Sequence, residues 1–190
     1  MLIYAPDSTS KTSSSSRHAL FLDRDGVINK EINYLHRIKD FKFIDGIFDL
    51  CKTAIEQDYR IIVITNQAGI ARGYYAEDDL AKLTKWMIQE FAGRGIEISK
   101  VYACPHLNDD CQDRKPNPGM LLQAQQDFNL DMSECIFIGD KPSDMEAGTR
   151  AGIDNLILFC EDAPSPKNID SKVKLISNLK QAKEFLNTNL

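Results

Sequence analysis

Two aspartates separated by one residue, Asp23 and Asp25, are the side chains of this sequence best placed to do chemistry together. They leave a short apolar run, and a spacing of two residues can turn both carboxylates to the same side of the chain. Close carboxylates repel unless a cation lies between them or one keeps a proton. One could then attack phosphorus to form an aspartyl-phosphate while the other moves protons. Taken alone, an exposed Asp-Gly turn ending at Gly26 explains the segment better, because such dipeptides are common.

Groups that could hold a phosphoryl group occur at two later places. Thr65, Asn66 and Gln67 begin a glycine-containing loop whose backbone N–H groups can bind phosphoryl oxygens. An ordinary polar connection between a strand and a helix explains them about as well. Lys115 can balance the charge that develops on a transferring phosphoryl group, and Arg114 can grip a substrate oxyanion. The alternative reading of these two residues is a basic pair on the surface.

A second pair of acids, Asp140 and Asp144, lies four residues apart where a strand is expected to give way to a helix. That spacing can place both carboxylates on one helix face, where they can serve Mg²⁺. We expect Asp140 to bind the ion directly and Asp144 to lie behind it. Asp144 could equally be a first-turn acid that the helix dipole stabilises.

Four soft or borderline metal ligands fall within ten residues of one loop: Cys104, His106, Cys111 and Asp113. Two close pairs around a short spacer suit a tetrahedral structural Zn²⁺, which would pin a loop without secondary structure of its own. An aspartate is uncommon in a thiolate-rich site. The alternative is a loop with two free thiols and a solvated histidine.

Alternating strands and helices must position these groups. The apolar runs expected as strands are 19–22, 61–64, 98–103, 136–138 and 155–159, and the expected helices are 46–58, 77–92, 118–128, 142–151 and 176–187. This alternation predicts a three-layer, Rossmann-like α/β fold with a parallel sheet and helices on both faces. In such sheets ligands bind at the carboxyl ends of the strands. Four polar clusters fall there, and they begin at Asp23, Thr65, Cys104 and Gly139. Turn formers and caps explain one cluster easily, but hardly four in register.

Size and composition limit the remaining possibilities. The 190 residues, 43% of them hydrophobic, suit one folded domain over 18–190, preceded by a disordered, serine-rich tail over 1–17. The net charge of −5 argues against nucleic-acid and anionic-membrane partners, which require basic faces. No apolar run approaches the roughly 18 residues of a membrane span, and no leader pattern is present. Together with five cysteines, an odd number, these features indicate a cytoplasmic protein with reduced thiols.

With its motifs in order over about 18–160, the sequence resembles the haloacid dehalogenase-like phosphatases. Within them it is similar to the D,D-heptose 1,7-bisphosphate phosphatases and to the histidinol-phosphatase domains. The segments that carry the resemblance are Phe21-Leu-Asp-Arg-Asp-Gly-Val-Ile-Asn29, Thr65-Asn-Gln-Ala-Gly-Ile-Ala-Arg-Gly73, Cys104-Pro-His106, Arg114-Lys-Pro-Asn-Pro-Gly-Met120 and Ile138-Gly-Asp-Lys141 with Asp144.

The resemblance implies roles for individual residues. Asp23 would be the nucleophile and Asp25 the general acid and base, with Thr65 and Lys115 stabilising the phosphoryl group. The Mg²⁺ ligands would be Asp23, the carbonyl of Asp25, and Asp140. The residues implied to contact a phosphorylated sugar are Arg24, Glu31, Ile32, Asn33, Tyr34, Thr65, Asn66, Gln67, Ala68, Arg114, Lys115 and Lys141.

The sequence departs from the family pattern in its zinc loop, where Asp113 stands in place of the usual last cysteine. Small members of the family lack a large cap domain, so loops would select the substrate, and we expect a monomer. The segments Gly-Val-Ile-Asn and Gly-Ile-Ala-Arg-Gly favour the heptose substrate, with histidinol phosphate as the alternative. A phospho-accepting receiver domain would need its aspartate after the third strand, where this chain has Ala103 and Cys104.

Overall fold

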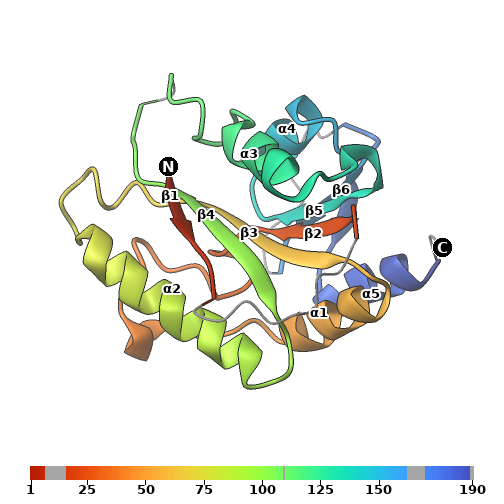
Figure 1. Ribbon diagram of the computed structural model, residues 1–190, viewed down its shortest axis with the longest axis horizontal. Coiled ribbons are helices and arrows are strands. Elements are labelled where there is room, and N and C mark those ends of the chain that lie inside the picture. The colour runs from red at the N-terminus through yellow and green to blue at the C-terminus, as the bar shows by residue number, and fades with distance from the viewer. Residues whose placement is uncertain (7–15, 109, 162–169, 189–190) are drawn as a thin grey trace.

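The computed structural model describes residues 1–6, 16–108, 110–161 and 170–188, and within them it places a seven-stranded sheet at the centre (Figure 1). The strand order is β1-β4-β3-β2-β5-β6-β7. The strands are β1 (Leu2–Tyr4), β2 (Ala19–Leu22), β3 (Arg60–Asn66), β4 (Ile98–Cys104), β5 (Ile136–Gly139), β6 (Asn155–Phe159) and β7 (Lys174–Ile176). Neighbouring strands are parallel except for the antiparallel pair of β1 and β4. The order reverses beside β2, which is where such sheets bind ligands.

Helices cover both faces of the sheet (Figure 1). One face carries α1 (Ile47–Glu56), α2 (Glu77–Ala92) and α5 (Leu179–Thr188), and the other carries α3 (Gly119–Phe128) and α4 (Pro142–Arg150). The expected three-layer α/β fold is therefore confirmed. In the part of the chain that the structure describes, no helix has the length and apolar character needed to cross a membrane.

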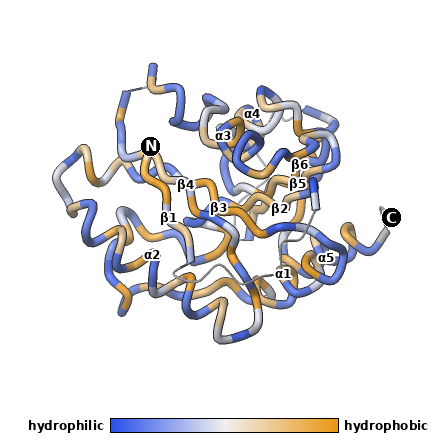
Figure 2. Tube along the Cα trace, in the orientation of Figure 1, coloured by the Kyte–Doolittle hydropathy of each residue, from blue (hydrophilic) through white to orange (hydrophobic). Residues whose placement is uncertain are grey.

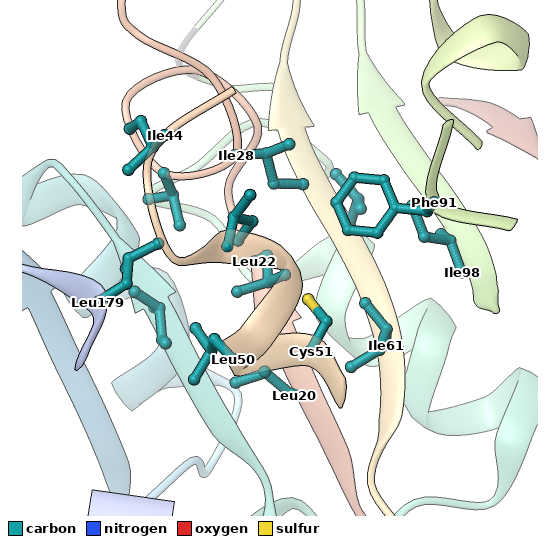
Figure 3. Packing of buried hydrophobic residues seen from close by; sticks show 14 of the residues in the cluster. Leu20, Leu22, Ile28, Ile44, Leu50, Cys51, Ile61, Phe91, Ile98 and Leu179 are labelled. Carbon is teal, nitrogen blue, oxygen red and sulfur yellow. The ribbon is translucent and has the colours of Figure 1, made fainter. Parts of the chain in front are cut away.

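The central strand β2 is buried on both faces, which explains its unbroken apolar sequence. Because side chains alternate along a strand, Leu20 and Leu22 pack into the cluster under α1, α2 and α5, whereas Ala19 and Phe21 pack under α3 and α4. Figure 2 shows the apolar residues concentrated along the strands. In Figure 3, Leu20 and Leu22 lie against Leu50 and Cys51 of α1.

The expected strands and helices are present with small shifts of their ends, but two short strands were not expected. The prediction of a disordered tail over 1–17 is wrong for β1, which pairs antiparallel with β4, with Leu2 opposite Ala103 and Tyr4 opposite Val101. Leu2 and Tyr4 also pack beside Leu80 of α2. Three residues bury enough surface here because a sheet edge and a helix are already in place. Most of the serine-rich stretch, residues 7–15, lies outside the described residues.

The connection from β2 to α1 contains a 3₁₀ turn, Ile38–Asp40, and no larger inserted domain. Asn29 forms isolated bridges with Asp25 and Phe43, which fold this connection back over the end of β2. A second 3₁₀ turn, Met132–Glu134, precedes β5. In the described residues, loops cover the end of β2 on this side of the sheet.

Candidate active site

Residues that follow β2, β3, β4 and β5 line one cavity of about 450 Å³. The predicted site residues that line it are Asp23, Asp25, Glu31, Asn33, Tyr34, Thr65, Asn66, Gln67, Ala68, Arg114, Lys115 and Lys141. They come from four segments that are far apart in the sequence. The four polar clusters thus meet at the carboxyl edge of the sheet.

Asp23 and Lys115 form the floor of the cavity. The backbone N–H of Asp23 donates to the carbonyl of Ile138 on β5 at 3.0 Å, which ties the first residue after β2 to the neighbouring strand. Its Oδ1 accepts from the N–H of Arg24 at 2.7 Å and lies 3.0 Å from Lys115 Nζ. The ammonium also donates to the carbonyl of Ile64 at 3.0 Å and lies 2.7 Å from Asp144 Oδ1. One cation therefore joins two carboxylates.

Burial and charge act against each other in this cluster. Burial raises the pKa of Asp23 well above its usual range; Lys115 opposes this effect, and the nearby carboxylates of Asp144 and Asp140 add to it. Burial disfavours the charged form of Lys115, but Asp144 and Asp23 outweigh burial, so the pKa of the lysine is raised. Lys115 is thus a permanent cation among acids that repel one another. An additional cation is needed to keep all of these acids ionised.

The carboxylates of Asp23, Asp140 and Asp144 offer oxygens within 4.8 Å of one another, which fits a divalent cation. Oδ1 of Asp140 is buried and, among the described residues, has no hydrogen-bond partner. Burial raises the pKa of Asp140 to about 6, with Lys141 opposing the shift and Asp144 adding to it. Glycine at position 26 leaves room for the Asp140 carboxylate, because a Cβ there would lie 2.3 Å from Asp140 Oδ2. Its φ of +88° also favours glycine.

Asp144 has a different role from Asp140. Its Oδ1 contacts Lys115, and its Oδ2 accepts from the backbone N–H of Lys141 at 3.0 Å, at the start of α4. Both of its oxygens are therefore engaged by the protein. The direct binding of a metal by Asp140, with Asp144 behind it, stays a prediction.

Asp25 is held by a set of donors that includes an unexpected one. Arg24, predicted to contact substrate, is only 1% exposed, and its guanidinium donates to both oxygens of Asp25 at 2.8–3.2 Å. It also donates to the carbonyl of Leu35 at 3.1 Å. Asn29 adds a bond to Asp25 Oδ1 at 3.0 Å. The prediction for Arg24 is therefore corrected: it orients Asp25, because its own neighbours turn it away from the cavity.

The last residues of β3 and the residue after them make two sets of contacts. Asn66 and Lys115 form a reciprocal pair, in which the Asn66 amide donates to the Lys115 carbonyl at 3.0 Å and accepts from its N–H at 3.1 Å. The pair docks the lysine segment on the end of β3. Gln67 Nε2 donates to Thr65 Oγ1 at 2.8 Å and to Asp25 Oδ2 at 3.0 Å. Thr65 and Gln67 are both buried.

The mouth of the cavity is formed by charged and aromatic side chains. Lys141 Nζ lies 2.9 Å from Glu31 Oε2 and 3.6 Å from Asp140 Oδ2, so it borders both the opening and the acid cluster. Arg114 donates to the carbonyl of His106 at 3.1 Å. Ile32 was predicted to contact substrate but is 42% exposed and does not line the cavity, because the chain turns its side chain outward there.

Some cavity-lining residues were not predicted. They are Gly69, Arg72, Tyr75, Pro116, Ser143 and Asp144 as a wall residue. Their types are common in loops, and no spacing sets them apart. The phenol of Tyr75 is buried beside Gln67, a contact that depends on how the loop folds back. The glycines at 69 and 73 are the only hint in the sequence that this loop turns tightly.

Three of the four predicted zinc ligands come together. Cys104 Sγ lies 3.7 Å from Cys111 Sγ and 3.9 Å from His106 Nδ1. Cys111 Sγ and His106 Nδ1 are 3.2 Å apart. Asp113 was predicted as the fourth ligand, and this is corrected. Its Oδ2 instead lies 3.3 Å from the N-terminal ammonium of Met1. β1 brings that terminus alongside β4, a pairing that the sequence prediction did not include.

Comparisons with known proteins identify the relatives of this chain. A family model described as polynucleotide kinase 3 phosphatase matches residues 20–182. The chain is 50% identical over 167 residues to the D-glycero-α-D-manno-heptose-1,7-bisphosphate 7-phosphatase of Campylobacter jejuni, covering 88% of this chain and 94% of that protein. It is 43% identical over 154 residues to the D-glycero-β-D-manno-heptose-1,7-bisphosphate 7-phosphatase of Yersinia pestis, covering 77% and 82%.

A solved structure is similar as well. It is the D,D-heptose 1,7-bisphosphate phosphatase of B. bronchiseptica, complexed with magnesium and phosphate. The match has a TM-score of 0.81 at 25% sequence identity and covers 90% of this chain and 99% of that chain. The fold thus has a counterpart in a phosphatase whose solved structure contains magnesium and phosphate.

Proposed function

The chain belongs to the haloacid dehalogenase-like phosphatases, within the D-glycero-D-manno-heptose-1,7-bisphosphate 7-phosphatase family, and from this membership we propose that it removes the 7-phosphate of that sugar bisphosphate with Mg²⁺. The observation that carries the proposal is the position of Lys115, which bridges Asp23 and Asp144 beneath the cavity. An ammonium there can balance charge on a phosphoryl group that sits on Asp23.

In the first step, a carboxylate oxygen of Asp23 attacks phosphorus, and the bond from phosphorus to the sugar oxygen breaks. Asp25 gives its proton to that leaving oxygen. The products are the sugar monophosphate and an aspartyl-phosphate. The Arg24 N–H and the Lys115 ammonium both contact Asp23 Oδ1, and these contacts would orient the carboxylate for the attack.

In the second step, water attacks the aspartyl-phosphate and gives a proton to Asp25. The bond from phosphorus to the Asp23 oxygen breaks, which releases inorganic phosphate and restores the carboxylate. Asp25 ends the cycle protonated, as it began. Arg24, Asn29 and Gln67 hold Asp25 in place for both transfers.

Asp23, Asp140 and the carbonyl of Asp25 would hold Mg²⁺, which supplies positive charge to the transferring phosphoryl oxygens. The orphaned Oδ1 of Asp140 and the space that Gly26 leaves open support this set. Asp144 would keep Lys115 and the start of α4 in register behind it. The hydroxyl of Thr65 would donate to a phosphoryl oxygen.

The sugar would lie toward the mouth of the cavity, against Glu31, Asn33, Tyr34 and Ala68. Arg114 and Lys141 would meet its remaining phosphate and hydroxyls. A polynucleotide end is the substrate that the family model's description suggests. The net charge of −5 and a cavity of about 450 Å³ favour a small sugar instead.

We also propose a structural Zn²⁺ on Cys104, His106 and Cys111, which would fix the loop that leads to Arg114 and Lys115. The cysteines among the described residues are free thiols, which suits a reducing cytoplasm. We further propose that the protein acts as a monomer.

The test is multiple-turnover phosphate release from both anomers of the heptose bisphosphate and from histidinol phosphate, with and without Mg²⁺. We expect Mg²⁺-dependent turnover of a heptose bisphosphate and none in Asp23→Asn, which should remain folded. Asp78→Asn, an exposed position in α2, is the matched control. Turnover of histidinol phosphate but not of a heptose bisphosphate would make histidinol phosphate the substrate. An active Asp23→Asn variant would overturn the mechanism.

A further inference from the structure

Tyr75 lines the cavity and is linked to Asp25 through one buried amide, that of Gln67. The phenol is 7% exposed, and its hydroxyl donates to Gln67 Oε1 at 2.6 Å. Gln67 is 2% exposed, and its amide nitrogen donates to Asp25 Oδ2 and to Thr65 Oγ1. The two hydrogens of the amide and its oxygen thus have three separate partners. Tyr75 is the only one of these partners that the proposed chemistry does not use.

We propose that Tyr75 is a positioning residue that locks the Gln67 amide in the orientation with its nitrogen toward Asp25. The inference rests on the phosphatase function proposed above, in which Asp25 delivers a proton to the leaving sugar oxygen. A glutamine amide has two orientations that occupy nearly the same space, so its hydrogen-bond partners decide between them.

The state of Asp25 explains why a lock is needed. While Asp25 is ionised, its oxygens accept hydrogen bonds and favour the nitrogen of Gln67. When Asp25 carries the proton for the leaving group, it becomes a donor, and a rotated Gln67 would offer it Oε1 as an acceptor. The proton would then be held by the amide instead of facing the substrate. Rotation would turn the amide hydrogens toward the Tyr75 oxygen, so the short bond to Oε1 would be lost and the buried phenol hydrogen would need another acceptor.

The surroundings of Tyr75 keep its hydroxyl in this position. A Cβ on Gly69 would lie 2.2 Å from Tyr75 Cε1, so the loop can pass the ring only with glycine there. The ring of His36 stacks on the ring of Tyr75, with centroids 5.1 Å apart and planes 11° apart. Burial raises the pKa of Tyr75 to about 12, so the hydroxyl remains a donor at neutral pH.

Tyr75→Phe removes the hydroxyl and keeps the ring, and its effect should depend on the leaving group. A sugar alkoxide needs a proton to leave, whereas p-nitrophenolate leaves without one. We expect kcat for the heptose bisphosphate to fall by about tenfold or more, with much less change for p-nitrophenyl phosphate. KM should change little, and Tm should fall by a few degrees, because one buried hydrogen bond is lost. Tyr74→Phe, which removes the hydroxyl of the exposed neighbouring tyrosine, should match the wild type.

A double-mutant cycle with Gln67→Met tests whether Tyr75 acts through the amide. We expect Tyr75→Phe to have no further effect on kcat once Gln67 is methionine. An equal loss in both backgrounds, an equal loss with both substrates, or no loss at all would overturn the inference. If the wild type hydrolyses p-nitrophenyl phosphate but no heptose bisphosphate, the proposed substrate fails instead, and the cycle can be run on another alkyl phosphate that the enzyme accepts.

Discussion

Lys115 Nζ lies 2.7 Å from Asp144 Oδ1, and both side chains are almost completely buried. This contact is shorter than the 3.0 Å between the lysine and Asp23. The acid that holds the lysine most closely is therefore the one that also receives the N–H at the start of α4. The position of the lysine beneath the proposed nucleophile depends on a residue that takes no direct part in the chemistry.

Asp144→Asn should therefore damage both stability and turnover. The substitution removes one charge of a buried pair, and an amide cannot accept from both Lys115 and the N–H of Lys141 in the same way. We expect a loss of about 3 kcal/mol in the free energy of unfolding, measured in urea. The value of kcat should fall about a hundredfold. Glu146→Gln, on the exposed side of the same helix, should change neither quantity; a stable and active Asp144→Asn would contradict this account.

Mg²⁺ should stabilise the protein more above pH 6 than below it. The pKa of Asp140 is raised to about 6, so in the folded protein it binds a proton more tightly than in the unfolded chain. The metal-free protein therefore loses stability as the pH rises through about 6. Over the same window the ionised Asp140 becomes available to the metal. We expect the Mg²⁺-induced rise in Tm to be larger at about pH 7.5 than at about pH 5.

The matched variant for this experiment is Asp140→Asn. Without the carboxylate, the rise in Tm with Mg²⁺ should be small at both pH values. If the wild type gains the same Tm from Mg²⁺ at both pH values, Asp140 is not the site of competition between the proton and the metal.

The zinc loop makes a separate prediction about metal content. The purified protein should contain about one equivalent of zinc, held by Cys104, His106 and Cys111. Cys111→Ser should lose the zinc, and proteases should then cut the loop more readily. Asp113→Asn should keep it, because Asp113 contacts the N-terminal ammonium instead. If Asp113→Asn loses the zinc, Asp113 is a fourth ligand, as expected from the sequence.

Arg24→Met separates a substrate contact from a positioning role. The guanidinium donates to both oxygens of Asp25 and is almost completely buried. Its removal should lower kcat with little change in KM, and should cost about 3 kcal/mol of stability. Arg37→Met removes an exposed arginine on the same connection and serves as the control. A raised KM with an unchanged kcat would show instead that Arg24 contacts the substrate.

Most of the fold could be predicted from the sequence because β2, β3, β5 and β6 are buried on both faces. Burial on both faces produces short apolar runs, and glycine, proline and aspartate end them. β1 and β7 have three residues each, too few to show a period. Their pairing depends on an edge that other parts of the chain provide, so it could not be read locally.

The candidate site was predictable to the extent that backbone topology places it. Asp23, Thr65, Lys115 and Asp140 meet because parallel strands end at one edge. The direction of a side chain at a loop depends on its tertiary neighbours instead. Arg24 turns toward Asp25, and Asp113 is drawn to the N-terminus, for reasons that neither residue type nor spacing contains.

The short strand β1 has a consequence for how the protein behaves in concentrated solution. It occupies the outer side of β4, whose N–H and C=O groups would otherwise be open along an apolar strand. Such an edge is a template for pairing with another molecule. β1 replaces it with an edge only three residues long, and Pro6 follows closely. We therefore expect that β1 lowers the tendency of the protein to aggregate, and that disrupting β1 reduces solubility more than catalysis.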